Sequence, residues 1–349
     1  MMEKISSIQP HKRLANLDLV RAVAIWLVLY FHICKLYLGN NITEKYYYNF
    51  GHQGVTVFFV LSGFLVGGIY YRKTNIKVGH FWLARFLRTY LPYLLILLIS
   101  WLSVYLVRKD PFEPGYLLFL QNFYPDINFF KISWSLAVEE HFYLLFALLI
   151  FLVRKPHLQI WIWLALLLIP LYYRFQFFQF PDNFGYYRTA SFLHLDAIAV
   201  GVIAAYLVYI RKIKIQLHPL VFISFLALTL LLFYLLELQD TAVFWAFGQS
   251  LANIVIGLLV ISAYFCKEVY LAKNKLVTWS AYMAYSLYLV HPTVMHLANY
   301  LFKFAHINNF VLELSISLTL IFATAYIFYL LVEQKSIQLR NRILKLLKA

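Results

Sequence analysis

Three polar side chains interrupt the apolar segment LDLVRAVAIWLVLYFHICK, namely Asp18, Arg21 and His32. A histidine can act as a general base near neutral pH. A charged side chain at the centre of a bilayer costs roughly 2.5–3.5 kcal/mol even on insertion-based scales. The eleven positions from Arg21 to His32 complete about three helical turns, so both side chains point the same way, about 16 Å apart along the axis. Asp18 shares that face approximately. The stripe therefore predicts a helix whose polar face lines a water-filled cavity or contacts other helices.

Two adjacent carboxylates follow in the segment WSLAVEEHFYLL, as Glu139 and Glu140. A carboxylate beside a histidine can fix the imidazole tautomer and support it as a general base. We therefore predict that Glu139 or Glu140 orients His32. The alternative is that these acids pair with Arg188 or Lys131 at the surface.

A buried acid and a histidine occur in two later apolar segments. Asp196 in LDAIAVGVIAAYL is either catalytic or the structural partner of Arg21 or of another buried cation. His291 precedes Pro292, where a kink would free backbone carbonyls that need polar partners. Ser286 and Tyr288 lie in the same segment and are candidate substrate-contacting or structural residues.

Arg85 and Arg88 lie three residues apart in HFWLARFLRTYLP, on one face of a helix. Such a pair suits a bidentate phosphate clamp. The alternative is that both are ordinary positive charges on the cytoplasmic side of the membrane.

The elements that position these residues are membrane spans. The 349 residues are 63% hydrophobic and 13% charged, with a mean hydropathy of +0.72, which predicts an all-α polytopic membrane protein. The two cysteines give neither a disulfide framework nor a metal-ligand spacing, so we predict no metal site. About ten spans are expected: 15–36, 54–71, 90–107, 133–153, 158–173, 191–210, 219–236, 244–265, 279–301 and 310–332.

The positive charge is distributed unevenly over the loops between these spans. With the N-terminus inside, 21 of the 30 lysines and arginines fall on the inner side and 8 on the outer side. This is the positive-inside pattern, and it predicts cytoplasmic termini and no nucleic-acid partner. We expect a cytoplasmic segment at 1–14, a membrane domain at 15–334 and a basic amphipathic tail at 335–349.

The ordered motifs together resemble the membrane-bound acyltransferase-3 family, the bacterial glycan O-acyltransferases. The resemblance extends from about Leu17 to Gln334 and rests on motifs that follow one another in the family's order. They are LDLVRAVAIWLVLYFH, GHQGVTVFFVLSGFLVGG, RFLRTYLP, WSLAVEEHFYLL, LDAIAVGVIAAYL, YSLYLVHP and VEQKS.

The resemblance implies transfer of an acyl group, acetyl being the commonest, from cytoplasmic acyl-CoA to a sugar hydroxyl across a bacterial cytoplasmic membrane. Arg21 and His32 match the family's essential pair, with His32 as general base or as the site of an acyl-histidine intermediate. Arg21, Arg85 and Arg88 would hold the CoA. No tightly bound cofactor is implied, and the partners would be membrane lipids, acyl-CoA and a glycan or lipid-linked sugar. The other recurring polar positions are matched by Glu139, Glu140, Asp196, Ser286, Tyr288 and His291.

The chain departs from the family pattern at three places. Ala84 stands where a first arginine is frequent, Thr56 stands where an acid is frequent, and the closing motif reads Glu333-Gln334-Lys335 rather than Glu-Lys-Pro. No extracytoplasmic hydrolase-like domain follows the last span, so a stand-alone form is expected. The alternative function is a transporter or flippase for a glycan or lipid-linked sugar, although no inverted repeat is visible.

Overall fold

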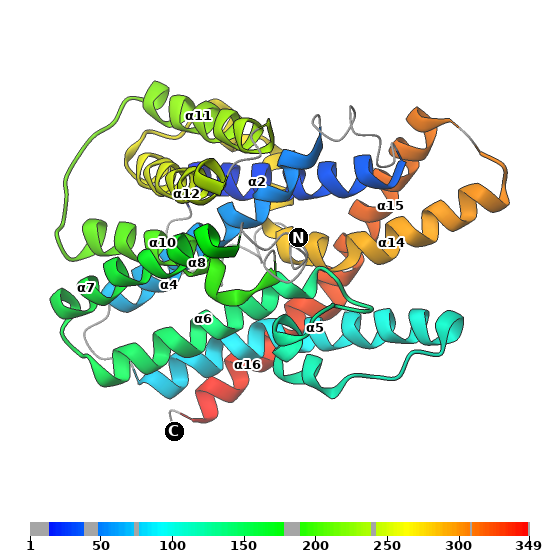
Figure 1. Cartoon of the computed structure of the whole chain (residues 1–349), viewed down its shortest axis with the longest axis horizontal. Helices are drawn as coiled ribbons and strands as arrows, with labels where there is room; N and C mark the ends of the chain where they lie inside the picture. The colour runs from blue at the N-terminus through cyan, green and yellow to red at the C-terminus, as the bar shows by residue number, and fades with distance from the viewer. Residues whose placement is uncertain are drawn as a thin grey trace.

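The computed structural model describes residues 14–37, 48–72, 77–177, 189–238, 242–307 and 309–347. In these ranges the secondary structure is helical, and one isolated bridge between Leu217 and Cys266 is the nearest approach to a strand. The helices form one elongated bundle (Figure 1). The α-helices are α2 (Ala15–Tyr37), α4 (Gly54–Arg72), α5 (Val78–Arg108), α6 (Ser133–Leu152), α7 (Pro156–Leu166), α8 (Leu168–Phe177), α10 (Leu195–Tyr209), α11 (Pro219–Leu238), α12 (Ala242–Phe265), α13 (Lys275–Tyr282), α14 (Ala284–Phe304), α15 (Phe310–Phe328) and α16 (Gln334–Leu346).

Short helical segments connect or extend these helices. Five are 3-10 helices, and the sixth, η7, is a π-helical segment between α15 and α16. Their bounds are η1 (Asn49–Gln53), η2 (Pro114–Leu118), η3 (Leu120–Phe123), η5 (Ser191–His194), η6 (Tyr270–Lys273) and η7 (Tyr329–Glu333).

Nine helices in the described part of the chain are long and apolar enough to cross a membrane. They confirm the predicted all-α polytopic fold. The expected ninth span is divided at Met283 into α13 and α14. The 21 residues of α14 suffice to cross a bilayer, but its histidines and Pro292 make it less apolar than the other spans.

Helix α5 is longer than the sequence suggested. The predicted third span started at residue 90, whereas α5 begins at Val78, so Arg85 and Arg88 lie inside the helix. The residues around the two arginines are mostly aromatic or aliphatic, and a long arginine stem can pack on apolar surface while its head stays solvated. Pro92 lies within α5 and does not end it. The helical face predicted for the two arginines before the third span thus belongs to the same continuous helix as that span.

Helices α4 and α10 cross in direct backbone contact at the centre of the bundle. A side chain on Gly63 would collide with the carbonyl of Ile198, and one on Gly201 with the carbonyl of Val60. Small residues allow such close packing between membrane helices, where the hydrophobic effect does not drive association. This contact fixes α10, and with it Asp196, against the helices that surround it.

The segment between α5 and α6 folds back over one end of the bundle. Tyr116 is fully buried, and its carbonyl accepts a hydrogen bond of 2.8 Å from the Tyr93 hydroxyl of α5. The Asn122 amide donates to the Trp134 carbonyl at the start of α6 (2.8 Å) and to the Ser191 hydroxyl (2.9 Å). The aromatic-rich loop thus covers the bundle at the end where α6 begins.

Candidate active site

Two histidines from different helices meet inside the bundle. His32 of α2 and His291 of α14 lie with their ring centroids 4.8 Å apart and their planes at 68°. His291 has no exposed surface, and His32 is partly buried. The sequence singled out both residues but did not predict that they are neighbours.

Backbone carbonyls determine which nitrogen of each ring is protonated in the neutral form. His32 Nδ1 lies 2.9 Å from the Val28 carbonyl oxygen, and His291 Nδ1 lies 3.1 Å from that of Leu287. A carbonyl oxygen only accepts, so Nδ1 must be the donor and Nε2 keeps its lone pair. The Nε2 atom of His291 is buried and has no hydrogen-bond partner among the described residues. Both rings therefore offer unprotonated Nε2 atoms, as a general base requires.

Pro292 lies within α14, directly after His291. A proline has no N–H, so the carbonyl four residues earlier in α14 loses its usual donor. The helix nevertheless continues through Pro292, and the His291 ring donates to the adjacent Leu287 carbonyl. The helical assignment is interrupted earlier, at Met283.

Glu139 and Glu140 lie elsewhere than predicted. Glu140 accepts a hydrogen bond of 2.6 Å from the Thr89 hydroxyl of α5, and Glu139 accepts one of 3.4 Å from Tyr143. Both carboxylates are within electrostatic range of Arg85. In the described residues neither glutamate contacts His32, and Val28 supplies the orientation that we had assigned to them. The prediction was wrong because the glutamates of α6 contact Thr89 of α5 and Tyr143 of their own helix rather than α2.

Arg85 and Arg88 form no direct ion pair with an acid in the described residues. In the ranges that the structure describes, neither guanidinium forms an ion pair within 4 Å or a side-chain hydrogen bond, and both side chains are partly accessible. The nearby acids Glu139 and Glu140 are hydrogen-bonded to hydroxyl groups instead. The two arginines therefore keep their donors available for an anion.

Arg21 has a protein partner. Its guanidinium forms an ion pair of 2.6 Å with Asp18, one turn earlier on α2. The predicted shared face of these two residues is confirmed, and α2 continues without interruption to His32 and beyond.

The remaining candidates on α14 connect it to neighbouring helices. The Tyr288 hydroxyl lies 2.6 Å from the Ser135 hydroxyl and donates to the Ile132 carbonyl at the start of α6. The Ser286 hydroxyl donates to the buried Glu333 carboxylate of η7 at 2.6 Å. These contacts hold α14 in register against α6 and η7.

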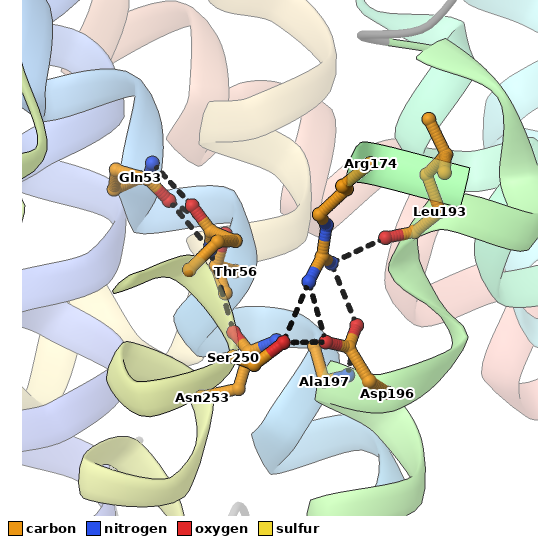
Figure 2. Close-up of polar contacts among 9 residues, drawn as sticks. Gln53, Thr56, Arg174, Leu193, Asp196, Ala197, Ser250 and Asn253 are labelled. Atoms are coloured by element: carbon orange, nitrogen blue, oxygen red, sulfur yellow. Dashed lines mark hydrogen bonds and ion pairs between the residues drawn. The ribbon is translucent and has the colours of Figure 1, made fainter. Parts of the chain in front are cut away.

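Asp196 is the partner of a cation that the sequence reading had placed in a loop. Arg174 of α8 is only 2% exposed, and its two terminal nitrogens contact the two Asp196 oxygens at 2.7 and 2.8 Å (Figure 2). Arg174 also donates to the Ser250 hydroxyl and to the Leu193 carbonyl. Of the two predicted roles for Asp196, the structure favours the partner of a buried cation, and that cation is Arg174 rather than Arg21.

A second polar group lies beside this pair, between α4 and α12 (Figure 2). The Gln53 amide donates to Gln249 (2.8 Å), and the Thr56 hydroxyl donates to Gln53 (3.0 Å). The Gln249 amide donates to Asn253 at 3.4 Å. The sequence reading missed this group because uncharged polar residues scattered over two segments do not stand out from the apolar background.

Contacts along α14 give the spacing between the arginines and the histidines. The Tyr285 hydroxyl donates to the Thr89 carbonyl of α5, next to Arg88, at 2.7 Å. His291 lies six residues further along α14 than Tyr285, which corresponds to about 9 Å of helix rise. The arginine pair and the histidine pair are therefore at different depths of the same bundle.

Comparison with known proteins identifies the family. The family model described as an acyltransferase domain matches residues 14–330. The chain belongs to the acyltransferase-3 family. The match ends before α16, which consequently lies outside the residues that define the family.

Relatives of this acyltransferase-3 protein include the O-acetyltransferase OatA of Staphylococcus aureus strains NCTC 8325 and COL, each 26% identical over 363 residues. The alignment covers 92% of this chain and 57% of OatA. A further S. aureus protein of strain COL, provisionally named an O-acetyltransferase, is 24% identical over 362 residues, covering 92% of this chain and 58% of the relative. The chain thus spans less than two thirds of these relatives. No solved structure matches it.

Proposed function

We propose that this protein is a membrane O-acyltransferase that moves an acetyl or other short acyl group from acyl-CoA to a hydroxyl of a glycan or lipid-linked sugar. The observation that carries the proposal is the His32 ring, whose Nδ1 donates to the Val28 carbonyl and whose Nε2 is left unprotonated beside His291. The names of the relatives, which are O-acetyltransferases, support transfer to oxygen.

In the proposed reaction, His32 Nε2 takes the proton of the acceptor hydroxyl as that oxygen attacks the thioester carbonyl. The new C–O bond forms, the C–S bond breaks, and the CoA thiolate leaves with the proton that His32 held. General base catalysis by a positioned histidine contributes typically about 10²–10⁴-fold. His291 supports this role by packing against His32. Its Nδ1–H donates to the Leu287 carbonyl and is therefore not available as a proton donor to His32.

The acyl-CoA donor would bind at the depth of Arg85 and Arg88, which differs from the depth of the histidine pair. Arg85 and Arg88 provide guanidinium groups that form no direct ion pair within the described ranges, which is an arrangement that suits phosphate. About 9 Å of helix rise separates the Thr89 level from the His291 level. A pantetheine arm is long enough to bridge a separation of that order, so the thioester could reach His32 while the nucleotide stays at the arginines. Arg21, paired with Asp18, would line the path between them.

The distribution of charge orients this arrangement in a bacterial cytoplasmic membrane. The predicted cytoplasmic termini place the arginines toward the cytoplasm and the histidine pair toward the outside. Acyl-CoA would then be used from within and the acceptor modified outside, without CoA crossing the membrane.

Vesicles of known orientation test the proposal. Purified protein is reconstituted with a glycan acceptor, and radiolabelled acetyl-CoA is supplied to one face at a time. We expect label on the acceptor only when acetyl-CoA is on the face that exposes the chain termini, and only on the acceptor of the opposite face. The exposed His157 on α7 gives a matched control, because His157→Ala should transfer label at the wild-type rate.

Two outcomes contradict the proposal. Label on the acceptor after supply of acetyl-CoA from the opposite face would exclude transfer through the bundle. Movement of unmodified acceptor across the membrane without any consumption of acetyl-CoA would replace the acyltransferase with the transporter.

A further inference from the structure

Helix α16 is attached to α5 at the turn that contains the arginines. The Ser336 hydroxyl is buried and donates to the Leu87 carbonyl at 2.8 Å and to the Arg88 carbonyl at 3.3 Å. Just before it, Glu333 is 1% exposed and accepts from Ser286 of α14. The start of α16 is thus fixed from two sides. Figure 1 shows α16 passing beside α5 after the chain leaves α15.

Arg340 lies one helical turn after Ser336, on the same face of α16. Ser336 places this face of α16 against the Leu87–Arg88 turn of α5, and Arg85 and Arg88 lie within electrostatic range of the Arg340 guanidinium. Its own hydrogen bonds, of 2.8 and 3.1 Å, go to the neutral amide oxygen of Asn341. Arg340 therefore adds a third cation to the Arg85–Arg88 pair.

No acid within the described ranges forms a direct ion pair, within 4 Å, with these three arginines. The acids in electrostatic range of Arg85 and Arg88, which include Glu139, Glu140 and Glu333, are hydrogen-bonded to hydroxyl groups. Like charges held together disfavour one another, and an anion bound between them reverses the effect.

We infer that Arg340 completes, with Arg85 and Arg88, the site for the phosphate groups of the nucleotide part of the acyl donor. This inference rests on the proposed use of acyl-CoA. Guanidinium groups bind phosphate oxygens in pairs of parallel hydrogen bonds, and CoA carries both a pyrophosphate and a 3′-phosphate, so three arginines have enough acceptors. Helix α16 then belongs to the donor site, although it lies beyond the residues matched by the family model.

The test compares Arg340→Gln with Arg342→Gln, which removes an equal charge from an exposed position two residues later. Transfer is measured with two donors, acetyl-CoA and S-acetylpantetheine, of which only the first carries a nucleotide. Loss of a hydrogen bond between charged partners typically weakens binding by about 10- to 100-fold. We expect Arg340→Gln to raise the KM for acetyl-CoA by about that factor and to leave kcat/KM for S-acetylpantetheine unchanged. Arg342→Gln should leave both unchanged.

Direct binding of CoA and of 3′-dephospho-CoA to the purified protein separates failure of the inference from failure of the proposed function. Wild-type protein that binds neither would refute the proposed donor. Wild-type protein that binds CoA, together with equal affinities in Arg340→Gln and Arg342→Gln, would refute the role of Arg340 alone. An equal loss of activity with S-acetylpantetheine would also refute it, because that result indicates a structural role for Arg340. If Arg340→Gln does not fold, Arg340→Lys provides the same comparison with the charge retained.

Discussion

Arg174 and the pair formed by Arg85 and Arg88 lie in different surroundings within this bundle. Arg174 is buried against both oxygens of Asp196, the Ser250 hydroxyl and the Leu193 carbonyl. Arg85 and Arg88 have no such partners among the described residues, and α16 brings a further positive charge toward them. A buried cation bound on both terminal nitrogens to a carboxylate serves the fold, whereas neighbouring cations that form no direct ion pair are suited to a ligand.

The same contrast separates the other polar side chains. Next to Arg174, Gln53, Thr56 and Gln249 mainly satisfy one another. Toward α14, the His291 Nε2 atom is buried without a hydrogen-bond partner in the described part of the chain. Substitutions in the first region should therefore affect stability, and those in the second should affect transfer.

The largest effect is expected at His32. His32→Ala should lower the rate of acyl transfer by about 10²–10⁴-fold, because it removes the proposed base. Its thermal unfolding should stay close to that of the wild type, since the hydrogen bond from the ring to Val28 lies within α2. Transfer assays and unfolding in the same detergent check both points. A His32→Ala protein that transfers at the wild-type rate would show that the base lies elsewhere.

The second effect concerns stability. Asp196→Ala leaves the Arg174 guanidinium buried without its carboxylate, which typically costs about 3–5 kcal/mol. Chemical unfolding of the purified variant measures the loss. The double variant Arg174→Met, Asp196→Leu removes both charges and should recover most of that stability, because apolar replacement of a buried ion pair is often neutral. If the folded double variant has lost acyl transfer, Asp196 and Arg174 act in catalysis and the comparison fails.

A smaller effect is expected at the unpaired arginines. Arg85→Gln or Arg88→Gln should raise the KM for acyl-CoA by about tenfold or more and leave the KM for the acceptor nearly unchanged, since each removes donors to phosphate only. Stability should not fall, because neither arginine forms an ion pair within 4 Å in the part of the chain that the structure describes. Steady-state kinetics with each substrate varied in turn check the prediction, and Lys77→Gln, exposed before α5, is the control. Equal changes in both KM values would indicate a structural role.

Much of this architecture could be predicted from the sequence, because span length and hydropathy are local properties. The face shared by Asp18 and Arg21 also followed from helical spacing, and the structure confirms it. The start of α5 at Val78 was missed, because two arginines lower the hydropathy of the segment before residue 90, although arginine stems can pack on apolar neighbours.

Contacts between distant segments could not be predicted in the same way. The pairing of His32 with His291, and that of Asp196 with Arg174, depends on how α2, α14, α8 and α10 pack. The orientation of His32 is supplied by a backbone carbonyl, which no side-chain motif reveals. Arg174 did leave a signal, since it is an ionisable residue at the end of an apolar run, but its position next to a predicted loop concealed it.

The smallest effect on the free energy of unfolding is expected at Asn253. This residue tests whether every buried polar atom without a hydrogen-bond partner marks a ligand site. Its Nδ2 atom is buried and has no partner in the described residues, and its oxygen accepts only a long hydrogen bond of 3.4 Å from Gln249. Replacing a poorly satisfied amide by an apolar group of similar size is nearly neutral, so Asn253→Leu should change the free energy of unfolding by less than about 1 kcal/mol.

The matched substitution Gln53→Leu should cost more, about 1–3 kcal/mol, because it deprives the buried Thr56 and Gln249 of partners. Neither variant should alter the KM for acyl-CoA or acceptor. Unfolding measurements and steady-state kinetics on both variants show whether these residues affect stability alone or substrate binding as well. An Asn253→Leu protein of normal stability whose acceptor KM rises would place a ligand contact beside Arg174 and Asp196. The polar side chains would then not separate into a structural group near Arg174 and a ligand-binding group near Arg85, Arg88 and α14. The path of the acceptor would have to include α12 as well as α2 and α14.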